Sequence, residues 1–441
     1  MKPMRAAVAC LSSLWLAGCS VLGGSTDTPP SGLVVGDEPY AVQAGATALA
    51  HGGSAADAVA ATYFALAVTY PVAAGLGGGG LCIVHDPQLD RTEAFEFLAR
   101  DGANPGEFAV PGNVSGFSLL QAAYGRLPWQ RVVSPGEGYA ASGFPISHAL
   151  ATRLAQSQDI IRLDAGLSAE FLDESGHLKP EGAYVTAPAL AQTLSAIRAA
   201  GPVSFYRGSV ADEIVRYAGS QNGGVAAADL QSYAPVRSPA LAVTIGSETA
   251  FVPPARLGAG KFTQALLSRL VGPGVQVAAG ANLSAAVAAA TGKTMEDFGL
   301  AALPRDLGAT GFAAEDSYGQ AAACAVTMNG PFGSGHSAGA TGVTLAHAPH
   351  LGQSGLSAAF LTPVVAMEGE ALGLVGAGAG GPNGTAAIGL ALLRFGQGLD
   401  VSQHTTGLAP FDTVNVIACQ NGHCAGLPDS GGFGLAASGQ S

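Results

Sequence analysis

The chain has 441 residues and a formal net charge of −12 at pH 7, and only 11% of its residues are charged. Hydrophobic residues make up 48%, which excludes a mostly disordered chain, because disorder requires low hydrophobicity and high charge. The acidic balance also excludes a general nucleic-acid binder, because such proteins neutralise phosphates with Lys and Arg. The length allows one large domain or two small ones.

The first 19 residues have the features of a lipoprotein signal peptide. Lys2 and Arg5 precede an apolar stretch over 6–16 that is too short to span a bilayer. Leu-Ala-Gly then leads to Cys19, the expected site of lipid attachment, although an ordinary signal peptide would share these features. Because residue 20 is Ser and not Asp, we expect a periplasm-facing protein anchored in the outer membrane of a bacterium with two membranes.

The ends beyond the signal are rich in Gly, Ser, Thr and Pro. We expect a flexible tether over residues 20–37 and a flexible tail over residues 428–441. Neither segment is expected to contribute to a core.

Between these ends, helical patterns dominate the first half and strand patterns the second. The predicted helices cover residues 41–50, 55–68, 113–124, 147–156, 187–200, 210–218 and 384–395. The predicted strands cover 81–85, 92–98, 241–251, 311–315, 321–328, 342–346, 362–367, 371–375 and 414–419, with a hairpin turn at 316–319. This order favours a layered α+β fold over alternating strand–helix units.

Four cysteines lie beyond the signal. Cys419 and Cys424 flank a Gln-Asn-Gly-His turn, so a local disulfide is expected in an oxidising compartment. A zinc site that includes His423 is the alternative, but four ligands are not evident, so no metal is expected. Cys82 and Cys324 lie in apolar runs and are expected to be buried thiols.

Two glycine-rich segments resemble nucleotide-binding motifs. The GAGAGG sequence at 376–381 matches the dinucleotide pattern, but no strand precedes Asp400, where the ribose-binding acid would lie. The GAGKFT sequence at 258–263 lacks the first glycine of a phosphate-binding loop. The sequence therefore predicts no cofactor.

A series of ordered blocks resembles the gamma-glutamyltranspeptidase family. The blocks include QAGATALAHGGSAADAVAATYFALAVTYPVAAGLGGGGLCIVHD at 43–86, VPGNVSGF at 110–117, DSYGQAAACAVTMNGPFGSG at 316–335 and VGAGAGG at 375–381. The resemblance implies a four-layer αββα N-terminal-nucleophile hydrolase fold that matures by self-cleavage. Residues 38–309 would form the large-subunit-like region and 310–427 the small-subunit-like region of the same globular domain.

The resemblance also implies the reacting groups. A threonine freed by self-cleavage uses its own α-amine as the base for its hydroxyl, and Thr310 is the candidate nucleophile. Alignment without gaps puts Ala309 at the nucleophile position, whereas Thr310 takes that position if the strand is one residue shorter. Gly380 and Gly381 match the glycines whose N–H groups hold the oxyanion in the family.

Three further residues are candidates for substrate binding. Asn329 matches a family residue that contacts the amino-acid end of the substrate, and Ser357 adjoins the position of paired serines. The family's carboxylate-binding arginine falls on Leu98, but Arg100 would face the same way along a strand.

Two functions follow from these residues. The first is a threonine-nucleophile amidohydrolase or acyltransferase that acts on glutathione-like or other small peptide amides after cleavage near Thr310. The alternative is an uncleaved, catalytically degenerate relative that serves as a binding or scaffold lipoprotein. The expected partners of the protein are a small-molecule or short-peptide substrate and, through the lipid anchor, the membrane.

Overall fold

A computed structural model describes residues 32–221, 223–254, 258–270, 281–351, 353–403, 411–429 and 434–439. The expected lipid-attachment residue Cys19 and the rest of the expected signal peptide lie outside the described residues. No helix among the described residues is both long enough and apolar enough to cross a membrane.

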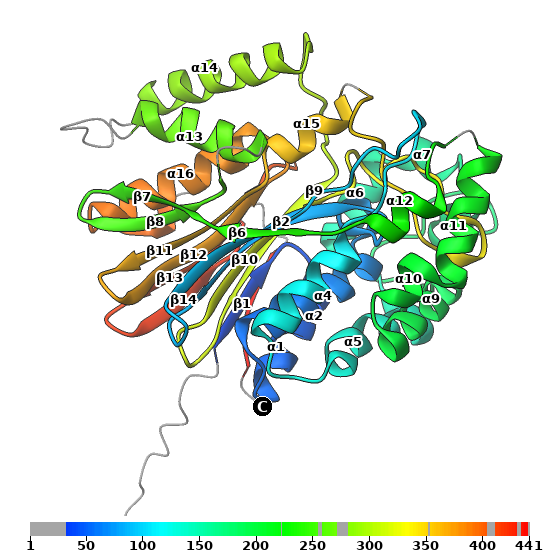
Figure 1. Ribbon diagram of the computed structural model, residues 1–441, viewed down its shortest axis with the longest axis horizontal. Coiled ribbons are helices and arrows are strands. Elements are labelled where there is room, and N and C mark those ends of the chain that lie inside the picture. Colours follow the sequence, from blue (N-terminus) through cyan, green and yellow to red (C-terminus); the bar gives the residue numbers. More distant parts are fainter. Residues whose placement is uncertain are drawn as a thin grey trace, which may run out of the picture.

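Two antiparallel sheets lie face to face at the centre of the molecule (Figure 1). The first has the order β15-β1-β9-β10-β2-β3-β6, and the second the order β14-β13-β12-β11-β8-β7. The first sheet contains β1 (Leu33–Gly36), β2 (Gly79–Asp86), β3 (Arg91–Phe97), β6 (Val236–Pro239), β9 (Ala309–Glu315), β10 (Ala321–Thr327) and β15 (Leu435–Ser438). The second contains β7 (Leu241–Ile245), β8 (Glu248–Val252), β11 (Thr362–Glu368), β12 (Ala371–Ala379), β13 (Thr413–Gln420) and β14 (His423–Leu427).

Helices cover the outer face of each sheet. The first helical layer and its extension contain α1 (Pro39–Ala50), α2 (Ala55–Thr69), α3 (Pro71–Ala74), α4 (Asn113–Tyr124), α5 (Trp129–Ser142), α6 (His148–Gln156), α7 (Gln158–Ile161), α8 (Ala165–Phe171), α9 (Pro188–Ala200), α10 (Val203–Arg207), α11 (Ser209–Ser220) and α12 (Ala227–Ser232). A short hairpin, β4 (Phe144–Pro145) with β5 (Tyr184–Val185), and the turn η1 (Gly339–Thr341) belong to this side.

The second sheet is covered by a smaller helical layer. It contains α13 (Gly258–Leu270), α14 (Ala281–Asp297), α15 (Gln353–Ala359) and α16 (Pro382–Gly396), with the short turn η2 (Val401–Gln403). Figure 1 shows α13, α14 and α16 on the opposite side of the sheets from α1, α2 and α4. The fold is therefore the four-layer αββα arrangement that the resemblance implied.

Small residues let the two sheets approach closely. Ala313 and Ala323 of the first sheet share an interior cluster with residues of the second. A Cβ added at Gly311 would lie 2.9 Å from the carbonyl oxygen of Ala377, so a larger residue would push the sheets apart. This packing accounts for much of the alanine and glycine content of the strands.

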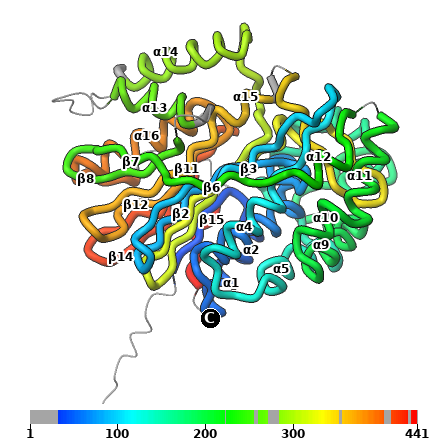
Figure 2. The backbone as a smooth tube through the Cα atoms, in the orientation of Figure 1, coloured from blue at the N-terminus to red at the C-terminus, as the bar shows by residue number. Residues whose placement is uncertain are grey.

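The predicted tether and tail are corrected in part. Residues 33–36 form β1, a buried strand between β15 and β9, and residues 435–438 form β15. Figure 2 shows these two ends of the chain side by side. Each strand has four residues, and its stability comes from pairing with distant segments, which a local composition does not reveal. The predicted strand at 342–346 is replaced by isolated bridges.

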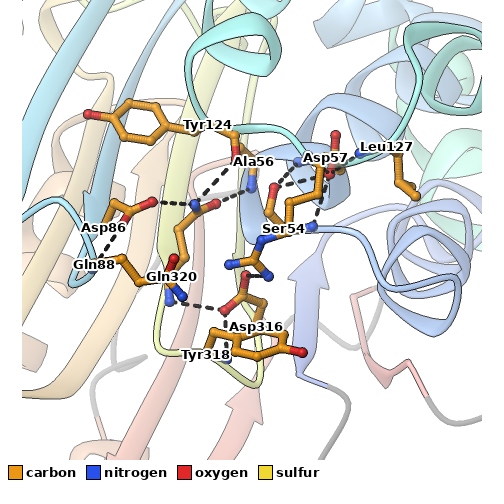
Figure 3. A network of polar contacts seen from close by, with 11 residues as sticks. Ser54, Ala56, Asp57, Asp86, Gln88, Tyr124, Leu127, Asp316, Tyr318 and Gln320 are labelled. Atoms are coloured by element: carbon orange, nitrogen blue, oxygen red, sulfur yellow. Dashed lines mark hydrogen bonds and ion pairs between the residues drawn. The ribbon is translucent and has the colours of Figure 1, made fainter.

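A buried polar network fixes α2 against the sheet (Figure 3). Ser54 caps α2, and the Asp57 carboxylate accepts from the Ser54 N–H at 3.0 Å and from the N–H groups of Arg126 and Leu127 at 2.7 and 3.0 Å. Gln320 accepts from the Ala56 N–H at 3.0 Å and donates to Asp86 at 2.8 Å. These bonds hold α2, the α4–α5 loop and the sheet in one arrangement.

Candidate functional site

The hydroxyl of Thr310 is bonded to a carboxylate in the interior. Thr310 lies near the start of β9 and is fully buried, and its Oγ1 donates to Asp37 Oδ2 at 2.5 Å. The other oxygen of Asp37 accepts from Asn415 Nδ2 of β13 at 2.7 Å. Burial raises the pKa of Asp37, and the hydrogen bonds from Thr310 and Asn415 offset part of this effect.

Asp37 falls within the predicted tether over residues 20–37, so the sequence does not predict it as a partner of Thr310. The apolar run at 33–36 followed directly by two acidic residues was the available signal of a strand end.

Ala309 points in the opposite direction from Thr310, as successive strand residues do. It belongs to an apolar cluster between the sheets, with Leu81, Leu361 and Ala377 among the other members, against which Leu98 packs. The two alternative nucleophile positions therefore have different surroundings. Thr310 faces a carboxylate, and Ala309 faces apolar side chains.

An ion pair lies next to Asp37. Arg153 of α6 is 2% exposed, and its Nη2 lies 2.6 Å from Asp306 Oδ1. The Arg153 guanidinium also packs over the ring of Phe411 at 4.9 Å. Its charge lowers the pKa of Asp37, although burial has the larger and opposite effect. Arg153 and Asp306 were not identified from the sequence, because they are 153 residues apart.

Gly380 and Gly381 lie at the end of β12, against the segment that contains Asp412. Gly380 has φ +87°, and a Cβ there would collide with the carbonyl oxygen of Phe411. A Cβ at Gly381 would collide with the Asp412 carboxylate. Burial raises the pKa of Asp412 to about 6, and the charge of Asp306 adds to this effect. Both glycines therefore let the backbone pass close to a buried acid.

Asn329 and Ser357 converge on the segment that leads into β9. Ser357 Oγ donates to the carbonyl oxygen of Leu307 at 2.8 Å. Thr327 Oγ1 donates to the same oxygen at 3.2 Å and accepts from the Asn329 N–H at 2.9 Å. The Asn329 side chain donates to the carbonyl oxygen of His347 at 2.9 Å. These contacts hold the backbone before Ala309 on several sides.

Arg100 has a different setting. It lies beyond the end of β3, forms an isolated bridge with Val110, and its guanidinium packs over the ring of Tyr233 at 5.0 Å. Leu98, at the position of the family arginine, is the residue that reaches the cluster around Ala309. The structure does not bring Arg100 into contact with Thr310 through any described hydrogen bond or ion pair.

The cysteines of the described residues form two disulfides. Cys419 and Cys424 are bonded across the β13–β14 hairpin. Cys82 and Cys324 are also bonded, which corrects the prediction of two buried thiols. They lie directly opposite each other on β2 and β10, with a Cα–Cα distance of 4.1 Å, so the strand register brings them together.

The glycine-rich segment at 376–381 does not have the setting of a dinucleotide-binding loop. The glycines of GAGAGG at 376 and 378 lie inside β12, between antiparallel neighbours, and not in a strand–helix crossover. The described residues contain no group of three or more His, Cys, Asp or Glu side chains placed to hold a metal ion.

Comparisons with known proteins agree with this architecture. The family model described as gamma-glutamyltranspeptidase matches residues 41–271, more than half of the chain. Glutathione hydrolase 2 of Arabidopsis thaliana is 32% identical over 243 residues, 52% of this chain and 42% of that protein. The glutathione hydrolase proenzyme of Pseudomonas aeruginosa is 33% identical over 227 residues, 47% of this chain and 40% of that protein. The matched region therefore spans about two fifths of these relatives.

Solved structures extend the likeness of fold to nearly the whole chain. The cephalosporin acylase of Bacillus halodurans superposes with a TM-score of 0.70 at 18% identity, over 93% of this chain and 96% of that one. At this identity, the superposition supports the shared fold and does not extend to a shared substrate.

Proposed function

The chain belongs to the gamma-glutamyltranspeptidase family, and on that premise we propose that it is a threonine-nucleophile amide hydrolase or acyltransferase. It would mature by cleavage of its own Ala309–Thr310 peptide bond into one fragment that contains the large-subunit-like region 38–309 and one that contains the small-subunit-like region 310–427. The observation that carries the proposal is the 2.5 Å hydrogen bond from the Thr310 hydroxyl to the buried Asp37 carboxylate. A base in this position is what a weakly acidic hydroxyl needs to become a nucleophile.

In the processing step, Thr310 Oγ1 attacks the carbonyl carbon of Ala309 and Asp37 accepts the hydroxyl proton. The C–N bond then breaks, the leaving amine takes up a proton, and an ester joins Ala309 to Thr310. Water hydrolyses the ester, which leaves a carboxylate on Ala309 and restores the Thr310 hydroxyl beside a free α-amine. That amine, with an ordinary pKa of about 8, would serve as the base in later turnovers.

The substrate would be a small amide whose acyl group moves from nitrogen to Thr310 Oγ1 and then to water or an amine. The N–H groups of Gly380 and Gly381 are the proposed oxyanion donors, and Asn329 and Ser357 the proposed contacts around the substrate. Leu98 replaces the family's carboxylate-binding arginine and packs on the cluster around Ala309. Glutathione-like and other small peptide amides are therefore both proposed substrates, with Arg100 as the proposed carboxylate contact.

We also propose that the protein is exported and attached to the outer membrane through a lipid on Cys19. The two disulfides support an oxidising compartment, because cytosolic thiols are kept reduced.

A specific observation favours the alternative of an uncleaved binding or scaffold lipoprotein. Thr310 is fully buried, and the position aligned with the family nucleophile, Ala309, faces Leu81, Leu361 and Ala377. In that case Thr310 would be a structural partner of Asp37.

Two measurements on the purified mature chain separate these functions. A reducing denaturing gel would show two fragments meeting near residue 310 if the chain is processed, and a single chain would refute self-processing. Release of nitroaniline from a γ-glutamyl nitroanilide and from simple peptide nitroanilides would then identify the acyl group. If cleaved protein releases nitroaniline from none of them, the proposed substrate class is wrong.

A further inference from the structure

A cavity of about 350 Å³ lies in the first helical layer, and neither Thr310 nor the proposed oxyanion glycines line it. Its walls come from the end of α2, from α8, from the start of α9 and from the segment at 342–344. Cavities of this size hold small organic ligands in other proteins. Neither Asn329 nor Ser357 lines it, so the cavity is separate from the proposed reaction site.

Buried apolar side chains form the inner wall of the cavity. Val68, Leu167 and Val343 line it and are almost fully buried. Gly342 has φ +66°, and a Cβ there would lie 2.6 Å from the Leu190 backbone nitrogen, so the wall depends on a glycine. An apolar group of a ligand would therefore meet a surface that is already formed.

One acid interrupts this apolar lining. Glu170 of α8 is half-buried and lines the cavity. The nearby ammonium group of Lys179 donates to the carbonyl oxygens of Ala169 and Glu170, at 3.5 and 2.7 Å, and not to the carboxylate. Among the described residues, no hydrogen bond to the Glu170 carboxylate is found. Burial raises the pKa of Glu170 to about 8, and the charge of Lys179 offsets part of this effect.

Because the Lys179 ammonium group donates to backbone carbonyl oxygens, the Glu170 carboxylate is left for a second cation. A carboxyl group in apolar surroundings ionises readily only when an opposite charge approaches. A hydrogen bond to a charged group contributes about 1.5–3 kcal/mol when both partners are well placed. The apolar wall and the single acid together define a ligand with an apolar body and one cationic end.

We propose that this cavity is a binding site for a small primary amine with an apolar body, whose ammonium group lies against the Glu170 carboxylate. The site is independent of the proposed amide chemistry, because none of Thr310, Asp37, Gly380 and Gly381 lines the cavity.

Titration calorimetry with phenethylamine and with its neutral analogue 2-phenylethanol tests the proposal on the folded full chain. The chain should bind the amine at least about tenfold more tightly than the alcohol, and Glu170→Gln should abolish that preference. Ala169→Trp, at an exposed residue of the cavity mouth, should block both ligands. Ala200→Trp, an exposed alanine at the far end of α9, is the matched control and should bind like the unmodified chain.

Three results would overturn the assignment. They are no measurable binding of phenethylamine, equal affinity for the amine and the alcohol, or an amine preference that survives Glu170→Gln. Unchanged binding in Ala169→Trp would place the amine elsewhere and would overturn it too. Thermal melting of each variant establishes that it is folded, and none of these results depends on whether the chain cleaves itself.

Discussion

Replacement of Thr310 by Val separates its chemical role from its structural one. The substitution keeps the volume of the side chain and removes the hydroxyl that donates to Asp37 at 2.5 Å. A hydrogen bond to a buried carboxylate contributes about 1.5–3 kcal/mol, so the free energy of unfolding should fall by about 2 kcal/mol. If Thr310 is the nucleophile, Thr310→Val should also abolish self-cleavage.

Thr69 provides a matched control. Its buried hydroxyl donates to the Glu38 carboxylate at 2.7 Å, which is a bond of the same kind on α2. Thr69→Val should lose a similar amount of stability in urea unfolding but should be cleaved normally. Thr310→Ser, which retains a hydroxyl, should also be cleaved. Cleavage that persists in Thr310→Val, or that is lost equally in Thr69→Val, would refute the assignment of Thr310.

Three further predictions concern the whole chain. The Cys82–Cys324 disulfide joins the two proposed fragments. On a denaturing gel, processed protein should therefore run as one species without reductant and as two after reduction. Two species without reductant would contradict this prediction. Burial raises the pKa of Glu38 from 4.5 to about 7, so between these pH values the native state keeps a proton that the unfolded state has released. The Glu38 carboxyl should therefore contribute a fall of roughly 3 kcal/mol in the unfolding free energy as pH rises from 4 to 8, and Glu38→Gln should remove that part of the measured slope; a slope that is the same in Glu38→Gln would contradict this contribution. Asp57→Ala leaves several buried donors without an acceptor and should lower the free energy of unfolding by at least about 3 kcal/mol in urea, whereas a loss below about 1 kcal/mol would contradict the role of Asp57 as a hub.

Elements with strong local signals could be predicted from the sequence. The helix over 113–124 has the bounds that the pattern indicated, and α2 begins at the Ser54 cap with Asp57 in its first turn. The hairpin of β9 and β10 follows from two apolar runs around a short polar turn. In each case the residues that decide the structure lie within a few positions of one another.

Elements that depend on distant partners were missed. β1 and β15 are four-residue strands whose register joins the two ends of the described chain. α5 escaped prediction because Pro135, Gly136 and Gly138 weaken its helical pattern. The Cys82–Cys324 bond requires the register of β2 against β10, and a count of cysteines does not supply it.

The candidate site also contains residues with a local sequence signal and residues that only the fold brings together. Sequence alone made Thr310 and the glycines at 380 and 381 candidates, because the glycines lie in a block that resembles the family and Thr310 lies shortly before another. It did not identify Asp37, which lies 273 residues from Thr310 and contacts it only in the folded sheet. Nor could it establish that Ala309 and Thr310 face opposite sides of β9, which is what distinguishes the two alignments.

The mass of the mature chain after reduction tests the central proposal most directly. The account predicts two fragments, one ending at Ala309 and the other beginning with the free α-amine of Thr310. A single mass that spans both residues would contradict it and would favour the uncleaved binding or scaffold lipoprotein.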